Sequence, residues 1–382
     1  MQIRTLNVNN FKSLVDFKLD LAKFTCLIGL NGAGKSTVLQ FIDFLAQQVR
    51  GDIKGWLRTR SWDAKDIFSQ FTEEARIEFS VCLKQDSGEL ATWEAEFDPV
   101  GLRCTRERIV IDDTTLEVHA ERVRVQPSDQ GRPLDQEIAF RYEGSILSQL
   151  RESTLPPRLV EVKRFCENVN SLGVMSPELL RQRTRTPAES LGLGGRGLPA
   201  VLHKLGAMER DALAAHLRKA YKQLRGMEIK SLRRGWKKLD IQEEFDGTKL
   251  VTDAHHVADG LLRLIAVLAE TQTEHRFLLF DEIENGINPE VVEFVLDALV
   301  SAPQQVLVTT HSPLILNYLS DDVARSGVIY LYKTRKGHTR AIPFFSIPSI
   351  AEKLTVMGPG EAFADTDLTH LQDEIEAVTE GK

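Results

Sequence analysis

The chain contains 382 residues, a length that fits two or three ordinary domains or one enlarged α/β domain with an insertion. Hydrophobic residues make up 42% and charged residues 27%, which allows a sizeable core and excludes disordered and fibrous classes. The formal net charge of −7 excludes a globally basic nucleic-acid binder, although a local basic patch remains compatible with it.

The chain lacks the usual marks of membrane insertion and secretion. No apolar run approaches the roughly 20 residues of a membrane helix, and the first residues lack the apolar core of a signal peptide. The cysteines are scattered without a CxxC pair, which is against a disulfide framework or a structural zinc site. We therefore expect a cytoplasmic protein with reduced thiols and no contact with a membrane.

An apolar strand followed at once by a glycine-rich turn and a helix stands near the start of the chain. A strand, a turn and a second strand are expected first, then a buried strand at 24–28 and a helix over about 36–48. The turn from Gly29 to Thr37 matches the phosphate-loop pattern GxxxxGK followed by Ser or Thr. The strand before it and the helix after it are the context that this motif requires.

The residue types of this turn suit phosphate binding. Glycines let backbone N–H groups turn inward onto phosphate oxygens, and the helix N-terminus adds positive potential. We expect Lys35 to bind the β- and γ-phosphates of ATP and the Ser36 hydroxyl to ligate Mg²⁺. The alternative is a glycine turn that binds no ligand. The residues predicted to contact the nucleotide in this turn are Asn31, Gly32, Ala33, Gly34, Lys35, Ser36 and Thr37.

The rest of the chain changes its periodicity twice. From about 75 to 143 apolar residues alternate, which predicts an antiparallel meander of half-exposed strands. From about 145 to 238 the spacing is mainly helical, with the best helix over about 207–224. The expected elements after that are helices at about 261–271, 289–300 and 313–319, strands at 277–280 and 306–309, and a hairpin at 327–345. Such alternation implies a parallel sheet with crossover helices.

Two strands in this last part end in polar clusters. Asp281 and Glu282 follow the strand at 277–280, so a buried strand would deliver Asp281 to Mg²⁺ and Glu282 to an attacking water. His311 follows the strand at 306–309 and is suited to sense or stabilise a γ-phosphate. The simpler alternatives are an acidic strand end and a surface histidine, and the phosphate loop upstream favours the functional interpretation.

The order of these motifs resembles the ABC-type ATPases of the SMC, RecF and OLD kind, and most closely the compact bacterial AAA_21-like ATPases. The matching segments, which span nearly the whole chain, are Asn10 to Ser13, Gly29 to Thr37, Ala258 to Arg263, Asp281 with Glu282, Glu284 to Pro289 and Thr310 to Pro313. The resemblance implies an α/β fold, namely a P-loop ATPase head with a mixed parallel sheet and an antiparallel β meander. The head would comprise residues 1–144 and 239–382, and residues 145–238 would form a helical lid or arm.

In this family two heads enclose two ATP molecules, and the phosphate loop of one head faces the signature helix of the other. By resemblance, the signature is Ala258, Asp259 and Gly260. Lys12 would lie near the nucleotide. The family has serine where this chain has Ala258, so one hydroxyl that would bind phosphate is missing. The resemblance thus implies a homodimer formed through ATP and Mg²⁺, with slow hydrolysis.

A basic stretch lies inside the expected insertion. Nine Lys and Arg side chains fall between residues 218 and 238, where Glu228 is the single acid. Tyr221 and Trp236 are interleaved with them. The stretch could grip a nucleic-acid backbone or dock an acidic partner, and a solvated helix face beside acidic neighbours is the alternative.

The leading hypothesis is an ATPase head that dimerises around nucleotide and switches a separate effector, such as a nuclease or a toxin. The chain beyond His311 is too short for the nuclease domain of OLD proteins, which is why the effector would be separate. The resemblance implies a setting in bacterial anti-phage defence or DNA repair. The alternatives are a nucleotide-locked scaffold with negligible turnover, and the motor of a membrane transporter, which the large insertion argues against.

Overall fold

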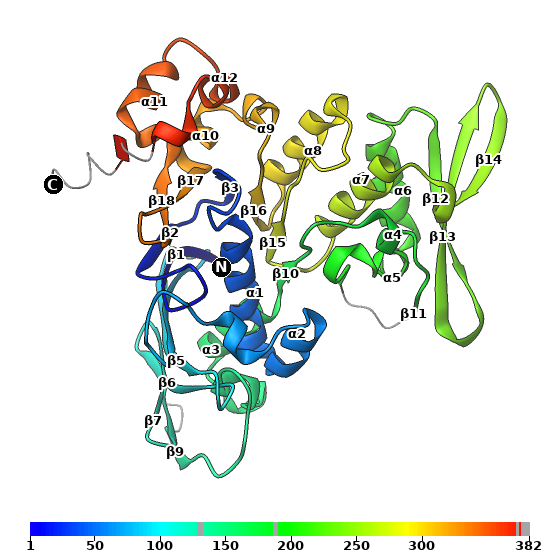
Figure 1. The fold of residues 1–382 in the computed structure, drawn as a ribbon. Coiled ribbons are helices and arrows are strands. Elements are labelled where there is room, and N and C mark those ends of the chain that lie inside the picture. The colour runs from blue at the N-terminus through cyan, green and yellow to red at the C-terminus, as the bar shows by residue number, and fades with distance from the viewer. Residues whose placement is uncertain (128–132, 186–189, 372–373, 376–382) are drawn as a thin grey trace. The chain divides into compact units, whose positions relative to one another are not determined.

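The computed structural model describes residues 1–127, 133–185, 190–371 and 374–375, drawn in Figure 1. The chain divides into two compact units. The first comprises Met1–Val169, Arg325–Glu352 and Thr366–Lys382, and the second comprises Asn170–Ala324 and Lys353–Asp365. Within the described ranges, no helix is both long enough and apolar enough to cross a membrane.

An antiparallel sheet dominates the first unit. Its eight described strands lie in the order β2-β1-β4-β5-β6-β7-β8-β9, and neighbouring strands pair antiparallel. The strands are β1 (Gln2–Asn9), β2 (Phe17–Asp20), β4 (Ile77–Lys84), β5 (Leu90–Asp98), β6 (Arg103–Ile111), β7 (Thr114–His119), β8 (Arg122–Gln126) and β9 (Leu134–Glu137). Buried and more exposed residues alternate along β4 and β5, as their period-two spacing predicts. The expected meander is therefore confirmed.

An aromatic cluster joins this sheet to helix α1. The helices of the unit are α1 (Lys35–Arg50), α2 (Ile53–Thr59) and α3 (Pro157–Glu167). The ring of Phe44 in α1 lies 5.0 Å from that of Phe97 in β5, and the ring of Phe41 lies 6.0 Å from that of Phe79 in β4. Phe11 fills the space beside both helix residues and is fully buried. Each such ring contributes about 1.5–3 kcal/mol by burial, so the cluster fixes α1 firmly on the sheet.

A second set of strands in the first unit leads into the glycine-rich turn. β3 (Phe24–Ile28) pairs parallel with β17 (Val328–Lys333), which pairs antiparallel with β18 (Thr339–Pro343). β3 is buried at every position and runs directly into the turn before α1. The expected hairpin after residue 327 is confirmed, and it places a late part of the chain beside an early strand.

The second unit contains a βαβ crossover. β15 (Phe277–Phe280) pairs parallel with β16 (Gln305–Thr309), and α8 (Pro289–Ser301) connects them. α8 begins at Pro289 after Asn288, whose side chain accepts a hydrogen bond from the Glu290 N–H. These elements agree with the sequence-based ones to within one or two residues. The other elements of the last third are α7 (Asp259–Glu270), α9 (Pro313–Asn317), α10 (Asp321–Gly327), α11 (Pro348–Lys353) and α12 (Pro359–Ala364).

The segment 145–238 is less helical than its spacing suggests. Its described elements are α3, β10 (Val169–Ser171), α4 (Pro177–Leu180), β11 (Thr184–Arg185), α5 (Leu198–Lys204), α6 (Ala207–Leu217), β12 (Leu224–Ser231) and the start of β13 (Trp236–Phe245). The helix expected at 207–224 is wrong in its last turns, because α6 ends at Leu217. β12, β11 and β14 (Thr248–Asp253) each pair with β13, and this pairing overrides the local helical spacing.

Candidate nucleotide-binding site

The glycine-rich turn between β3 and α1 has a backbone that only glycine fits. Gly29 has φ of 144° and Gly34 has φ of 112°, both outside the range that side chains favour. A Cβ atom on Gly29 would lie 2.3 Å from the Leu331 carbonyl oxygen, and one on Gly34 would lie 2.4 Å from the Thr339 hydroxyl oxygen. The glycines therefore let the turn pass close to β17 and β18.

Lys35 and Ser36 stand where this turn becomes α1. The Lys35 Nζ atom donates hydrogen bonds to the Gly29 carbonyl at 2.8 Å and to the Leu30 carbonyl at 3.2 Å. Lys35 is buried, whereas Ser36 is exposed at the helix N-terminus. The turn thus curls around an ammonium group and presents a hydroxyl beside the positive end of the helix. This arrangement suits an anionic phosphate chain and its metal.

Thr339 in β18 holds the turn from behind. Its hydroxyl donates to the Ala33 carbonyl at 3.0 Å and hydrogen-bonds the Ser13 hydroxyl at 2.9 Å, and its N–H donates to the Ser13 carbonyl at 2.9 Å. The side chain is fully buried. Thr339 therefore ties the N-terminal strand–turn and the phosphate loop together, a role that no motif in the sequence indicated.

Lys12 lies beside an aromatic ring in the same unit. Its Nζ atom is 3.4 Å from the centroid of the Trp62 ring and donates to the Gln40 side chain of α1 at 2.8 Å. Burial, and then the positive charge of Arg60, lower the pKa of Lys12 to about 8. Trp62 was not singled out from the sequence, because its contact with Lys12 is non-local. Lys12 is thus a cation whose charge is sensitive to slightly alkaline pH.

Asp281 and Glu282 follow β15 in the second unit and are held by Thr309. The Thr309 hydroxyl donates to Asp281 Oδ1 at 2.6 Å and accepts from the Glu282 N–H at 2.8 Å. Glu282 adopts φ of 50°, a left-handed conformation that is uncommon for a residue with a side chain and often occurs at functional sites. Asn285 donates to Glu282 Oε2 at 3.4 Å. The buried Thr309 therefore positions the Asp281 carboxylate and the Glu282 backbone, while Asn285 contacts the Glu282 carboxylate.

His311 lies in the same part of the second unit. Its N–H donates to Glu284 Oε1 at 2.8 Å, and its side chain is exposed after β16. The Ile283 N–H donates to the Thr309 carbonyl at 3.2 Å, which joins the ends of β15 and β16. The parallel pairing thus brings the segments of Asp281, Glu282 and His311 to one edge, as their positions after two strands predict.

The segment 258–263 forms the start of α7 and contacts the loop after β15. Ala258 is the N-cap of α7 and provides no side-chain cap, while Asp259 forms an ion pair with Arg181. The Arg263 guanidinium donates to the Asn285 carbonyl. A Cβ atom on Gly260 would lie 3.0 Å from the Gly286 carbonyl oxygen, so glycine permits this close approach. The expected signature and the loop after β15 are therefore neighbours within the second unit.

The predicted site residues divide between the two units. The turn at 29–37 and Lys12 belong to the first unit, and Asp281, Glu282, His311 and the segment 258–260 belong to the second. The structure places each group within its own unit. That the two groups meet around one nucleotide remains a prediction.

Comparisons with known proteins agree on the class of this chain. Residues 1–123 match a family model described as an AAA ATPase domain, and residues 192–317 match one described as an AAA domain, putative AbiEii toxin, Type IV TA system. A segment of 79 residues is 38% identical to an OLD nuclease from Thermus scotoductus, covering 21% of this chain but 14% of that protein. The chain therefore aligns with only a small part of that relative.

Two solved SMC heads share the fold. One is an SMC head bound to the C-winged helix domain of ScpA, with a TM-score of 0.55 and 16% identity over 90% of this chain and 97% of the other. The second is an Smc head with an extended coiled coil bound to the C-terminal domain of ScpA from Pyrococcus furiosus, with a TM-score of 0.52 and 12% identity over 93% and 99%. Together, the two family matches, the similar segment of the OLD nuclease and the shared fold support an ABC-type ATPase of the SMC, RecF and OLD kind.

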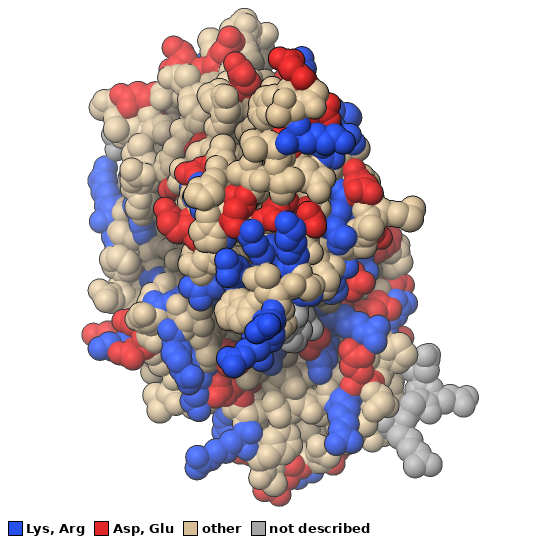
Figure 2. Space-filling model, turned by 90° about the vertical axis from the view of Figure 1, so that its right-hand side faces the viewer, with Lys and Arg blue, Asp and Glu red and all other residues tan. Residues whose placement is uncertain are grey.

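The basic stretch at 218–238 lies largely in strands β12 and β13, and ion pairs neutralise part of its charge. Lys230 pairs with Asp240 at 2.7 Å, and Lys238 pairs with Asp240 at 2.9 Å and with Asp253 at 2.8 Å. Figure 2 views the side that carries β12–β14 in Figure 1 and shows Lys and Arg interspersed with Asp and Glu. The local excess of positive charge is therefore smaller than a count along the sequence suggests, and nucleic-acid contact remains a prediction.

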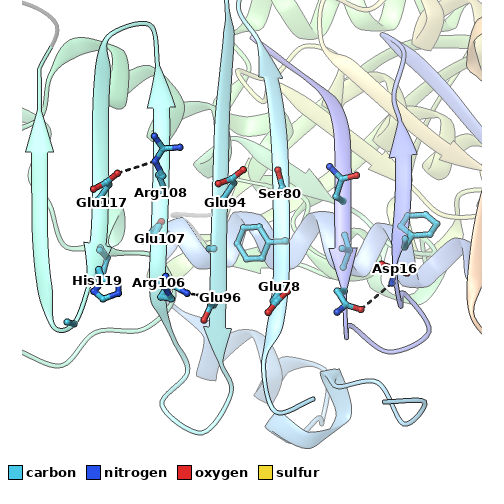
Figure 3. A pocket seen from close by; sticks show the side chains of 18 of the residues that line it. Asp16, Glu78, Ser80, Glu94, Glu96, Arg106, Glu107, Arg108, Glu117 and His119 are labelled. Carbon is cyan, nitrogen blue, oxygen red and sulfur yellow. Dashed lines mark hydrogen bonds and ion pairs between the residues drawn. The ribbon is translucent and has the colours of Figure 1, made fainter. Parts of the chain in front are cut away.

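The first unit also has a pocket on the polar face of its eight-stranded sheet. It has a volume of about 890 Å³, and Figure 3 shows side chains from several strands lining it. Arg108 pairs with Glu117 at 3.1 Å, and Arg106 pairs with Glu96 at 3.0 Å. These cross-strand ion pairs balance the charges of four of the lining residues. None of the predicted nucleotide-site residues lines it.

Proposed function

We propose that the chain binds MgATP between the turn at 29–37 and the acid at 281, hydrolyses it, and dimerises around it to switch an effector. The observation that supports this proposal is that the chain forms two half-sites, one in each unit. One is the glycine-rich turn around Lys35, and the other is the strand end at which Thr309 binds the Asp281 carboxylate and the Glu282 backbone N–H. Both are of the kind that phosphoryl transfer requires, and the ATPase family models span both segments.

The chain offers suitable groups for each part of MgATP. Lys35 and the backbone N–H groups of the turn would bind phosphate oxygens, and Ser36 and Asp281 would hold the metal, which commonly takes one or two carboxylates in proteins. MgATP supplies the phosphoric anhydride and a cation that neutralises charge. Glu282 Oε2 would orient a water molecule and take its proton. His311 would lie near the γ-phosphate and stabilise its charge. Within the described residues, no group of three or more His, Cys, Asp or Glu forms a separate metal site.

Lys12 predicts a pH dependence of ATP affinity. Its pKa of about 8 lies below the ordinary value, so the ammonium loses its charge as pH rises through 8. If Lys12 binds phosphate, the affinity for ATP should fall about tenfold above this pH, since a charge-assisted hydrogen bond contributes about 1.5 kcal/mol or more. Calorimetric titration from pH 7.5 to 9.5 measures the fall. The Lys12→Arg variant should lose it, because guanidinium stays charged; parallel slopes for both proteins would contradict the role of Lys12.

The contacts of the signature segment at 258–263 support dimerisation around the nucleotide. Gly260 and Arg263 of α7 lie against the Gly286 and Asn285 carbonyls, so α7 and the loop after β15 form one surface. In the SMC, RecF and OLD kind of ATPase, such a surface meets the phosphate loop of the partner head. We infer the same arrangement for two copies of this chain.

Ala258 predicts that a single substitution will raise turnover. As the N-cap of α7 it offers no hydroxyl, and serine there would donate to phosphate and cap the helix. Ala258→Ser should raise the steady-state rate of phosphate release severalfold. Ala258→Gly is the matched control, because glycine also suits an N-cap but adds no hydroxyl. Equal rates for all three proteins would show that another step limits hydrolysis.

The effector is proposed to be a separate protein, a nuclease or a toxin, in bacterial anti-phage defence or DNA repair. The support is the similarity of one segment to a protein named OLD nuclease and the toxin–antitoxin wording of one matching family model. Purification of the chain with the proteins encoded beside it, with and without ATP, tests this. A nuclease or toxin retained only with ATP supports the switch, and a chain that purifies alone in both conditions contradicts it.

A nucleotide-locked scaffold is the second candidate, and Ala258 is the observation that favours it. Such a protein would bind ATP and dimerise without releasing phosphate. Steady-state phosphate release by the wild-type protein separates the two functions, because sustained turnover is incompatible with a scaffold.

A further inference from the structure

β14 is an edge strand that protrudes from the sheet of the second unit. It pairs with β13 from Asp240 opposite Asp253 to Phe245 opposite Thr248, without a register shift. Along its other side, no strand pairs with it in the part of the chain that the structure describes. Four of its six residues are exposed, and Figure 1 shows the strand at the outer end of the hairpin. Its outer row of backbone N–H and C=O groups is therefore open to a further strand.

The β13–β14 hairpin carries large apolar side chains on both faces. Leu239 and Ile241 are buried, and the alternation of β13 continues the same face to Phe245, which is 48% exposed. Leu250 of β14 lies on this face and is 49% exposed, while Val251 lies on the opposite face and is 54% exposed. Because apolar side chains are exposed on both faces, no hydrophobic core covers this end of the two-stranded ribbon.

The edge has few of the features that prevent strand addition. Proteins protect such edges with proline, bulges or inward-pointing charges. β14 contains no proline, and its pairing with β13 has no bulge. Its charged residues are Lys249 near one end and Asp253 at the other, of opposite sign and four residues apart. If a second copy of β14 lies antiparallel to the first, Lys249 of each strand can therefore lie opposite Asp253 of the other.

We propose that β14 of one copy pairs antiparallel with β14 of a second copy, across a two-fold axis at Val251. In this register Val251 faces Val251 of the second copy, and Leu250 faces Thr252. Each Lys249 then faces Asp253 of the second copy. Asp253 already pairs with Lys238 of its own chain at 2.8 Å, so each Lys249 would join an existing ion pair across the junction. Centring the axis on Leu250 instead would place Lys249 opposite Val251 and leave the charges unmatched. A two-fold axis perpendicular to the sheet keeps each side chain on the same face in both copies. Residues that face each other across the axis must therefore both be odd-numbered or both be even-numbered.

The second copy is favoured over another protein by this self-complementarity. A two-fold interface requires that one patch match itself, and the spacing of Lys249 and Asp253 about Val251 meets that condition. The pairing would join the two sheets and bring the Phe245 and Leu250 side chains of both copies to one face. The interface involves no residue of the proposed nucleotide site, so it is expected to form without ATP.

Cysteine cross-linking at Val251 tests the pairing. Val251→Cys would place two thiols opposite each other at the axis, and mild oxidation without nucleotide should link most chains into dimers. The control is Val100→Cys, at a position 93% exposed in the first unit. It should give at least about tenfold less dimer, because a disulfide needs Cβ atoms within about 4.5 Å of each other. Wild-type protein controls for the native thiols, of which Cys26, Cys104 and Cys166 are buried.

A second pair of variants keeps the test independent of cysteine chemistry. Val251→Asp would oppose two carboxylates at the axis and should halve the molar mass seen by light scattering, whereas Val251→Thr should preserve the dimer. The cross-link should also persist in the Lys35→Ala variant, which distinguishes this interface from a nucleotide-dependent one. A wild-type monomer at tens of micromolar, or a cross-link that appears only with ATP, would overturn the proposal; so would a β14 edge that binds only another protein.

Discussion

Lys35→Ala is expected to abolish ATP binding. The Lys35 ammonium is enclosed by the carbonyls of Gly29 and Leu30 at the start of α1, where phosphates are expected to bind. Two charge-assisted hydrogen bonds to phosphate contribute about 3–6 kcal/mol together. Their loss should weaken ATP binding by about 10²–10⁴-fold. Isothermal titration with MgATP measures this change.

A surface lysine provides the control for that variant. Lys65 is largely exposed, with 80% of its side chain accessible, and Lys65→Ala should leave the affinity unchanged. The melting temperature of Lys35→Ala should stay close to that of the wild type without ATP, which shows that the turn still folds. An unchanged ATP affinity in a folded Lys35→Ala protein would refute the role of the phosphate loop.

Glu282→Gln is expected to trap an ATP-bound dimer. Glutamine keeps the shape of the side chain but cannot take a proton, and general-base catalysis contributes about 10²–10⁴-fold to rates. Phosphate release should therefore fall by at least about a hundredfold while ATP binding is retained. Sedimentation velocity with ATP should show a dimer that is absent without ATP in a β14-disrupted background such as Val251→Asp. The phosphate assay and the sedimentation run together separate chemistry from assembly.

The exposed Glu290 in the first turn of α8 gives a matched control. Glu290→Gln changes the same chemical group nearby and should leave turnover close to that of the wild type. If Glu282→Gln hydrolyses ATP at the wild-type rate, the general base is another group. If it stays monomeric with bound ATP, the nucleotide does not hold two heads together.

Local patterns predicted the parts of the fold that local physics determines. The strand at 24–28, its glycine turn and α1 form a contiguous unit, because a buried apolar strand, glycines with positive φ and a helical apolar period occur in sequence. The βαβ segment from Phe277 to Thr309 was predictable for the same reason. Its strands are short, wholly buried and apolar except for Gln305 and Thr309 at the ends of β16, and a proline marks the start of the helix between them.

Non-local contacts explain what could not be predicted. Thr339 hydrogen-bonds the phosphate loop from a strand far along the chain, and the Trp62 ring contacts the Lys12 ammonium across a loop. No sequence motif therefore marks either residue. The residues after Leu217 leave the helix because β13 supplies a pairing partner that the local sequence does not reveal. Ion pairs such as Lys230 with Asp240 likewise reduce the net positive charge of the stretch at 218–238, which is not evident from the sequence of that stretch alone.

We propose that Ser36 of the first unit and Asp281 of the second hold the same metal ion. A double-mutant cycle by calorimetry, with Ser36→Ala, Asp281→Asn and both together, tests it through the affinity for MgATP. Each single variant should lose most of the affinity that depends on Mg²⁺, and the double variant should be no weaker than either, because ligands of one ion are coupled. Additive losses, or wild-type protein that releases no heat with MgATP, would contradict the claim.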